Sequence, residues 1–136
     1  MKNILCFLLF LLTLSCKKEN SNEPTVDISK IYGKWDWTGS SGGLAGKSYT
    51  PQSEHQNQSL IIANDNKMSF YINGSLKLQR QFTLRKDKSF LTGDTAYIIH
   101  YIPASLDQVI LKAKTDTLIL SDEANDGFTS GYVKHK

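Results

Sequence analysis

The chain has 136 residues, 40% of them hydrophobic and 21% charged, with a formal net charge of +3. This length fits one small domain and is short for a two-domain enzyme. The apolar content is too high for a disordered tail, and the net charge is far too low for a nucleic-acid-binding domain. We therefore expect a single globular domain with no nucleic-acid partner.

The first fifteen residues differ from the rest of the chain. Lys2 supplies a positive charge, and an uninterrupted apolar stretch follows from Ile4 to Leu12. A helix needs about 20 apolar residues to cross a bilayer core, so this stretch is too short to span a membrane. A positive start and a short apolar region are typical of a secretory signal, which we predict over residues 1–15.

The predicted signal ends in a motif that resembles the lipobox of bacterial lipoproteins, Leu12-Thr13-Leu14-Ser15-Cys16, although Thr13 stands where leucine is usual. The following Lys17-Lys18-Glu19 is similar to the start of many lipoproteins of the Bacteroidota. The resemblance implies that Cys16 becomes the N-terminus and carries a lipid such as palmitate, which anchors the protein in the envelope at the outer membrane. The alternative is cleavage near Ser15 without lipidation.

The cysteine count agrees with an anchoring role. Cys6 leaves with the predicted signal, so the mature chain keeps one cysteine and forms no internal disulfide. Residues 17–27 contain a single apolar residue, Val26, and are predicted to be flexible. We expect residues 16–27 to join the lipid to a domain over residues 28–136.

Apolar residues in this domain recur with a period of two, which is typical of strands with one buried face. Trp35 and Trp37 share one face of the first predicted strand. Further alternating runs place on one face Leu60 and Ile62; Met68, Phe70 and Ile72; Leu76, Leu78, Phe82 and Leu84; Tyr97, Ile99 and Tyr101; Val109, Leu111 and Ala113; and Leu118 and Leu120, before a last strand over residues 128–134. Asn73-Gly74 between two runs is a strong hairpin signal. About eight strands joined in sequence order predict an all-β fold, a small up-and-down antiparallel β-barrel.

The start of the domain, Ile31-Tyr32-Gly33-Lys34-Trp35, resembles the first signature of the lipocalins. Further segments are similar to short lipocalin-like lipoproteins of the Bacteroidota: residues 37–46, Tyr49-Thr50-Pro51, residues 116–122, residues 126–128 and Tyr132-Val133-Lys134. The resemblance covers most of residues 31–136. It implies a lipocalin-like barrel that binds a small apolar molecule inside, with Gly33, Trp35 and Lys134 as structural closure residues.

Side chains on the predicted inner face are the candidate ligand contacts: Trp37, Phe70, Leu78, Arg80, Phe82, Tyr97, Ile99 and Tyr101. Arg80 lies on the predicted apolar face of its strand, where an isolated charge is costly unless an acidic group pairs with it. We hypothesise that Arg80 binds the acidic head of a ligand. The alternatives are a bulge between Gln79 and Gln81 that turns Arg80 outward and a side chain that reaches the barrel mouth.

Residues 42–48 look like a phosphate-binding loop, but Ser41 stands where that motif needs glycine and no strand–helix pattern surrounds it. We therefore predict no nucleotide binding. We expect residues 39–57 to form a long flexible loop that folds across the barrel mouth.

No catalytic or metal site is predicted. His55, His100 and His135 lack metal-ligand spacing, and the acidic stretch from Asp122 to Asp126 fits a hairpin connection better than a calcium loop. No serine lies in a nucleophile-elbow pattern, and no carboxylate pair falls in one predicted pocket. We expect a monomer without enzymatic activity or cofactor that binds a small hydrophobic or amphipathic molecule. The alternative is an interaction or structural module of an envelope complex, with a solid barrel.

Overall fold

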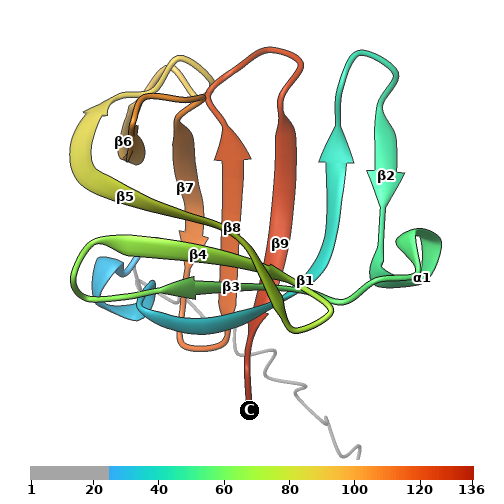
Figure 1. Cartoon of the computed structure of the whole chain (residues 1–136). Coiled ribbons are helices and arrows are strands. Elements are labelled where there is room, and N and C mark those ends of the chain that lie inside the picture. Colours follow the sequence, from blue (N-terminus) through green and yellow to red (C-terminus); the bar gives the residue numbers. More distant parts are fainter. Residues whose placement is uncertain (1–24) are drawn as a thin grey trace, which may run out of the picture.

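A computed structural model describes residues 25–136 of the chain (Figure 1). The predicted signal and Cys16 lie outside the described residues. The last residues of the expected tether run along the barrel, because the Asp27 N–H donates to the Ala113 carbonyl at 2.9 Å and the Ala113 N–H donates to the Thr25 carbonyl at 3.1 Å. The ordered domain therefore includes residues 25–27.

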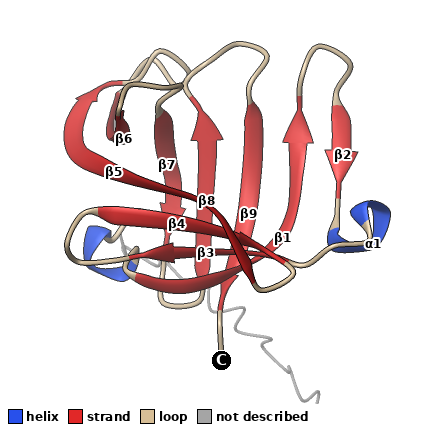
Figure 2. Cartoon of the chain, viewed as in Figure 1, coloured by secondary structure: helices blue, strands red, loops and turns tan. Residues whose placement is uncertain are grey.

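Strands make up most of the described residues, and two short helical segments accompany them (Figure 2). Their bounds in chain order are η1 (Ile28–Lys30), β1 (Gly33–Gly42), β2 (Lys47–Tyr49), α1 (Pro51–Glu54), β3 (Gln58–Ile62), β4 (Lys67–Ile72), β5 (Ser75–Lys88), β6 (Thr95–Ile102), β7 (Gln108–Ala113), β8 (Thr117–Asp122) and β9 (Phe128–Lys134). Asn73 and Gly74 connect β4 to β5 with φ values of 50° and 76°. This is the backbone that the Asn-Gly hairpin signal requires.

The sheet closes on itself through β1. From β3 to β9 each strand pairs with the next, and β1 pairs with both β3 and β9. The pairing register of β1 shifts between Trp37 and Gly39, and β1 runs beneath the molecule beside β3 before it turns upward beside β9 (Figure 1). The prediction of an all-β, antiparallel barrel of eight strands is confirmed, with β2 as an additional strand on β1.

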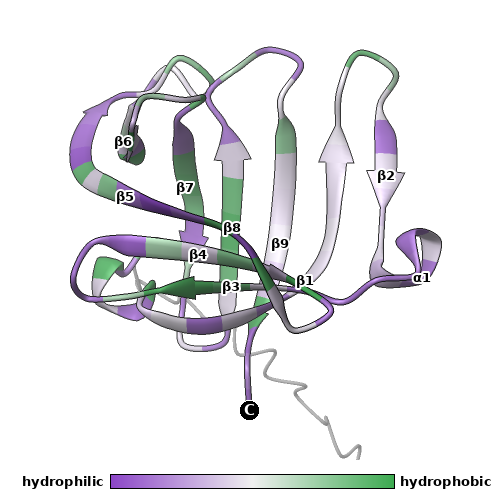
Figure 3. Cartoon of the chain, in the orientation of Figure 1, coloured by the Kyte–Doolittle hydropathy of each residue, from purple (hydrophilic) through white to green (hydrophobic). Residues whose placement is uncertain are grey.

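Large apolar side chains fill one part of the barrel. The buried cluster comprises Ile31, Trp35, Leu60, Ile62, Met68, Phe82, Ile99, Tyr101, Ile110, Ala113, Leu118 and Leu120. In Figure 3 the most hydrophobic segments lie on β3, β7 and β8, whereas the later part of β1 and the middle of β9 are pale. The barrel therefore has a solid apolar region and a region lined by aromatic and small polar residues.

Two bulges change the faces that simple alternation predicts. In β5, Leu78 pairs with Phe70 but Leu76 pairs with Tyr71, so Leu76 lies on the face opposite to Leu78, and the prediction that they share a face is wrong. The cause is an extra residue, Lys77, in one strand of the pair.

A second bulge lies in β7, where the pairing shifts between Ile110 and Lys112. Ile110 and Ala113 consequently belong to the core cluster, and the predicted face of Val109, Leu111 and Ala113 is wrong. Strand alternation thus fails wherever one residue is left without a partner.

Residues 39–57 are more regular than the expected loop. They contain the end of β1, the strand β2 and the helix α1. Tyr49 pairs with Ser40 across the β1–β2 hairpin, and Thr50 then caps α1. The expectation of a long flexible loop is therefore corrected: the segment is a hairpin followed by a capped helical turn.

Candidate functional site

The predicted closure residues meet where β1 begins. The Lys134 ammonium lies 4.1 Å from the centre of the Trp35 ring and donates to the Tyr32 carbonyl at 2.6 Å. Desolvation lowers the pKa of Lys134. Gly33 has a φ of +125°, and a Cβ atom there would lie 2.6 Å from the Lys134 ammonium nitrogen. The Trp35 indole N–H is also occupied, because it donates to the Ile31 carbonyl at 2.7 Å. These contacts connect the start of β1 to the end of β9 and occupy the polar groups of Trp35 and Lys134.

A pocket of about 340 Å³ opens at another place on the barrel. It is formed by β4, β5, β6, the β6–β7 connection, β7 and the end of β8. Its lining residues are Phe70, Leu78, Arg80, Tyr101, Ser105, Leu106, Gln108 and Asp122. Leu78 is 41% exposed and Leu106 is 52% exposed, so the pocket offers apolar side chains that the fold itself does not bury.

Arg80 provides the positive charge of this pocket. It pairs with the fully buried Met68, and the register runs without a break from Lys67↔Gln81 to Phe70↔Leu78. Arg80 therefore stays on the face that carries the core, without the bulge considered between Gln79 and Gln81. Of the alternatives, the geometry matches a side chain that lies on the inner face and reaches a pocket open to solvent.

The Arg80 guanidinium is held by uncharged groups. Its central carbon lies 5.5 Å from the centre of the Tyr101 ring, and it donates to the Ser105 hydroxyl. Within residues 25–136, no carboxylate forms an ion pair with Arg80. A guanidinium carries five N–H donors, so most of them remain available to an acceptor from outside the chain.

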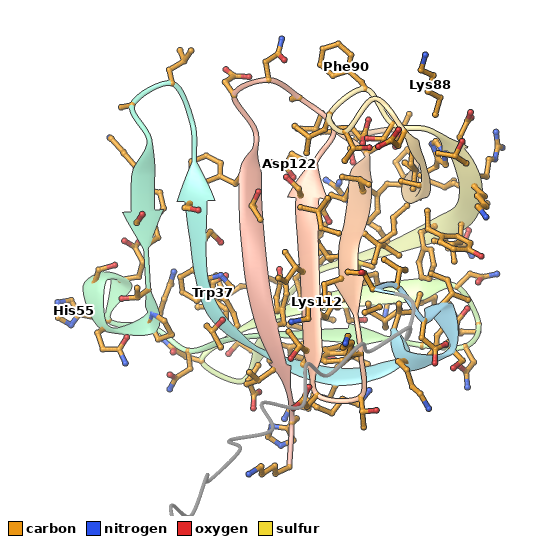
Figure 4. All side chains as sticks on the ribbon, turned by 180° about the vertical axis from the view of Figure 1, so that it is seen from behind. Trp37, His55, Lys88, Phe90, Lys112 and Asp122 are labelled. Carbon is orange, nitrogen blue, oxygen red and sulfur yellow. The ribbon has the colours of Figure 1, made fainter. Side chains whose placement is uncertain are left out.

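The acid in the same pocket, Asp122, already accepts hydrogen bonds from other residues of the chain. The Tyr101 hydroxyl donates to Gln108 Oε1 at 2.7 Å, and Gln108 Nε2 donates to Asp122 Oδ1 at 2.9 Å. The second Asp122 oxygen accepts from the Phe128 backbone N–H at 3.0 Å. Figure 4 shows Asp122 near the end of β8. Burial raises the pKa of Tyr101, which keeps its hydroxyl a donor. Arg80 is thus the charged group of the pocket with free hydrogen-bonding capacity.

The structure divides the eight predicted ligand contacts among three places. Phe70, Leu78, Arg80 and Tyr101 line the pocket, although Tyr101 also belongs to the core. Phe82 and Ile99 are buried in the core, Tyr97 packs against it, and Trp37 lines a different pocket. Sequence reasoning missed Ser105, Leu106, Gln108 and Asp122. Gln108 and Asp122 face each other across β7 and β8, and only the strand register could have brought them together.

The second pocket has a volume of about 280 Å³. It lies between the later part of β1, β2, α1 and the start of β3 and β9. Its lining residues are Trp37, Ser40, Tyr49, Glu54, Gln58 and Phe128. The Trp37 indole N–H donates to the Ser40 hydroxyl at 2.8 Å, and the Ser40 and Ser130 hydroxyls lie 2.7 Å apart. Three of the six lining residues, Trp37, Tyr49 and Phe128, are aromatic.

The three histidines lie far apart in the fold. His55 projects from the end of α1 (Figure 4). His100 Nδ1 lies 2.7 Å from an Asp107 carboxylate oxygen, and His135 Nδ1 lies 2.8 Å from one of Asp36. Among the described residues, no group of three or more histidine, cysteine and acidic side chains could hold a metal ion.

No protein family, curated protein or solved structure was found to match the chain. Across residues 25–136, no helix is both long enough and apolar enough to cross a bilayer.

Proposed function

We propose that the chain is a lipid-anchored lipoprotein of the bacterial envelope whose lipocalin-like barrel binds a small hydrophobic or amphipathic molecule. The observation that carries the binding role is Arg80, a cation without a carboxylate partner among residues 25–136, in a pocket with exposed apolar side chains. The lipobox-like motif at Cys16 and the signal before it support the anchor and the outer-membrane location.

The pocket suits a ligand with an acidic head and an apolar tail. A carboxylate can accept two parallel hydrogen bonds from one guanidinium, which makes such a pair stronger than a neutral hydrogen bond. The tail would cover Phe70, Leu78 and Leu106, and burial of apolar surface contributes about 25 cal/mol per Å². A medium-chain fatty acid has both features.

Binding of laurate to the purified protein tests this proposal. We expect Arg80→Ala to weaken laurate binding about tenfold, because it removes a charge-assisted pair worth roughly 1.5–3 kcal/mol. Arg85→Ala is the matched control, since Arg85 is exposed on the same strand β5 and lines neither pocket. Isothermal titration calorimetry measures both affinities. Equal laurate affinity in the wild type and Arg80→Ala would overturn the role of Arg80.

The competing role is an interaction or structural module of an envelope complex. The observation in its favour is an exposed aromatic side chain, Phe90, which is 66% exposed on the β5–β6 connection (Figure 4). Native mass spectrometry of the protein purified from its host separates the two roles. One small molecule per chain supports the binding proposal, whereas a persistent protein partner supports the alternative.

A further inference from the structure

The second pocket combines three aromatic rings with one acidic side chain. Trp37, Tyr49 and Phe128 supply the rings, and Glu54 supplies the carboxylate. We propose that this pocket binds a methylated ammonium group. The proposal is independent of the acidic ligand at Arg80, because the two pockets share no lining residue.

Two of the three rings, those of Tyr49 and Phe128, lie close together without stacking. The ring centres of Tyr49 and Phe128 lie 5.8 Å apart, and the ring planes are inclined by 45° rather than stacked. Trp37 is 6% exposed, and its N–H donates to Ser40. Because its N–H is engaged, Trp37 has its aromatic ring left for contact with a ligand in the pocket that it lines. Faces of aromatic rings attract cations, and tryptophan does so best.

Glu54 gives the pocket a negative charge. Glu54 is the only charged residue that lines it, and within residues 25–136 its carboxylate has no hydrogen-bond or ion-pair partner. Glu54 is placed by a short, well-capped turn. The Thr50 N–H donates to the Ser53 hydroxyl at 2.9 Å, and the Ser53 N–H donates to the Thr50 hydroxyl at 3.1 Å. Because Tyr49 directly precedes this turn, the capping bonds fix the backbone that carries both the Tyr49 ring and the exposed Glu54 side chain.

The composition of the pocket selects among cations. Calcium and magnesium sites take several oxygen ligands, carboxylates foremost, and beside Glu54 this pocket offers only the uncharged oxygens of Ser40, Tyr49 and Gln58. A primary ammonium carries three N–H donors that need acceptors. A trimethylammonium group needs none and is attracted by aromatic faces, as in cages that bind choline and methyl-lysine. Its source is either a free solute or a lipid headgroup.

The two tryptophans provide a test with an internal control. The chain has only Trp35 and Trp37, so a ¹H–¹⁵N spectrum contains two indole signals. Trp35 donates to the Ile31 carbonyl in the core, and Trp37 lies at the pocket. We expect choline to shift the Trp37 signal saturably and to leave the Trp35 signal in place. The Trp37→Phe variant identifies the signal.

Four comparisons distinguish a cation site from an apolar one. The uncharged carbon analogue of choline, 3,3-dimethyl-1-butanol, should bind at least about tenfold more weakly than choline. Glu54→Gln and Tyr49→Leu should each weaken choline binding by about three- to tenfold. Asp94 is an exposed acid outside the pocket, so Asp94→Asn should leave the affinity for choline unchanged. Equal binding of the uncharged analogue, or full affinity in Glu54→Gln, overturns the proposal.

The source of the group is tested in the same spectrum. Saturation by dissolved choline supports a free solute, and saturation by phosphatidylcholine vesicles alone supports a lipid headgroup. If neither moves the Trp37 signal, the proposal is wrong. Arg80→Ala should keep the full choline response, which separates failure of this site from failure of the acidic-ligand site.

Discussion

Polar side chains at the edge of the core are joined by hydrogen bonds. Tyr101, Gln108 and Asp122 form a chain of hydrogen bonds that ends on the backbone of Phe128. Tyr132 lies near the same acid, and burial together with the Asp122 charge raises its pKa to about 12, against the opposing effect of its hydrogen bond with Ser130. These phenols therefore stay neutral well above physiological pH.

The raised pKa of Tyr132 predicts a loss of stability in alkali. A group whose pKa is higher in the folded state contributes stability that is complete below its ordinary pKa of 10 and declines as the pH rises to about 12. The difference corresponds to at most roughly 2–3 kcal/mol. In urea unfolding at pH 9 to 12, we expect the free energy of unfolding of Tyr132→Phe to fall less steeply than that of the wild type. Parallel curves would contradict the assignment.

At the scale of elements, one acidic side chain joins two connections. Glu123 follows β8, and its two carboxylate oxygens accept from the Ser89 hydroxyl at 2.5 Å and from the Phe90 N–H at 2.8 Å. The Ser89 hydroxyl in turn accepts from the Thr92 N–H at 3.1 Å. The β5–β6 connection is therefore fixed to the β8–β9 connection.

Removal of this carboxylate should loosen the β5–β6 connection. We expect Glu123→Ala to lower the free energy of unfolding by about 1–3 kcal/mol, because it removes two hydrogen bonds and leaves the buried Ser89 hydroxyl without its acceptor. Amide hydrogen exchange at residues 89–94 should become faster, while exchange in the core strands follows only the change in global stability. Asp126→Asn is the control, since Asp126 is an exposed acid in the same β8–β9 connection. Unchanged exchange at residues 89–94 would show that Glu123 does not hold the connection.

Local sequence patterns predicted most strands, because each strand is indicated by its own alternation of apolar and polar residues and by the turn residues beside it. The hairpin at Asn73-Gly74 is an example, since its backbone follows from those two residues. The bulge at Lys77 was not predictable in this way, because it depends on how β5 aligns with β4. Alternation by itself placed Arg80 correctly on the inner face, where no bulge intervenes.

The sites were harder to predict than the strands because they combine distant segments. Trp37 and Arg80 were recognised as candidates for one barrel interior, yet they line separate pockets. Glu54 and Asp122 gave no local signal, since an acid in a polar segment normally lies in solvent. Their places follow from the tertiary fold: β1 pairs with β9 on one side and with β2 on the other, and β5 and the end of β8 line the same pocket.

At the scale of the whole molecule, the proposed function requires that the barrel be attached to a membrane. The proposed attachment point, Cys16, lies outside residues 25–136, and Thr25 and Asp27 at the start of the described residues pair with Ala113 of β7. Few residues therefore separate the proposed lipid from the barrel. Covalent acyl chains contribute about 0.8 kcal/mol for each buried methylene, so several chains give stable anchoring.

Metabolic labelling with palmitate tests this anchor in the native host. We expect the wild type to incorporate palmitate and Cys16→Ala to lose the label completely, because the acyl chains would be carried by that residue alone. Cys6→Ala is the matched control and should keep the label, since Cys6 lies within the predicted signal. Labelling is preferable to fractionation, because an uncleaved signal can itself hold Cys16→Ala at a membrane. A labelled Cys16→Ala protein, or an unlabelled wild type, would show that Cys16 is not the site of lipidation.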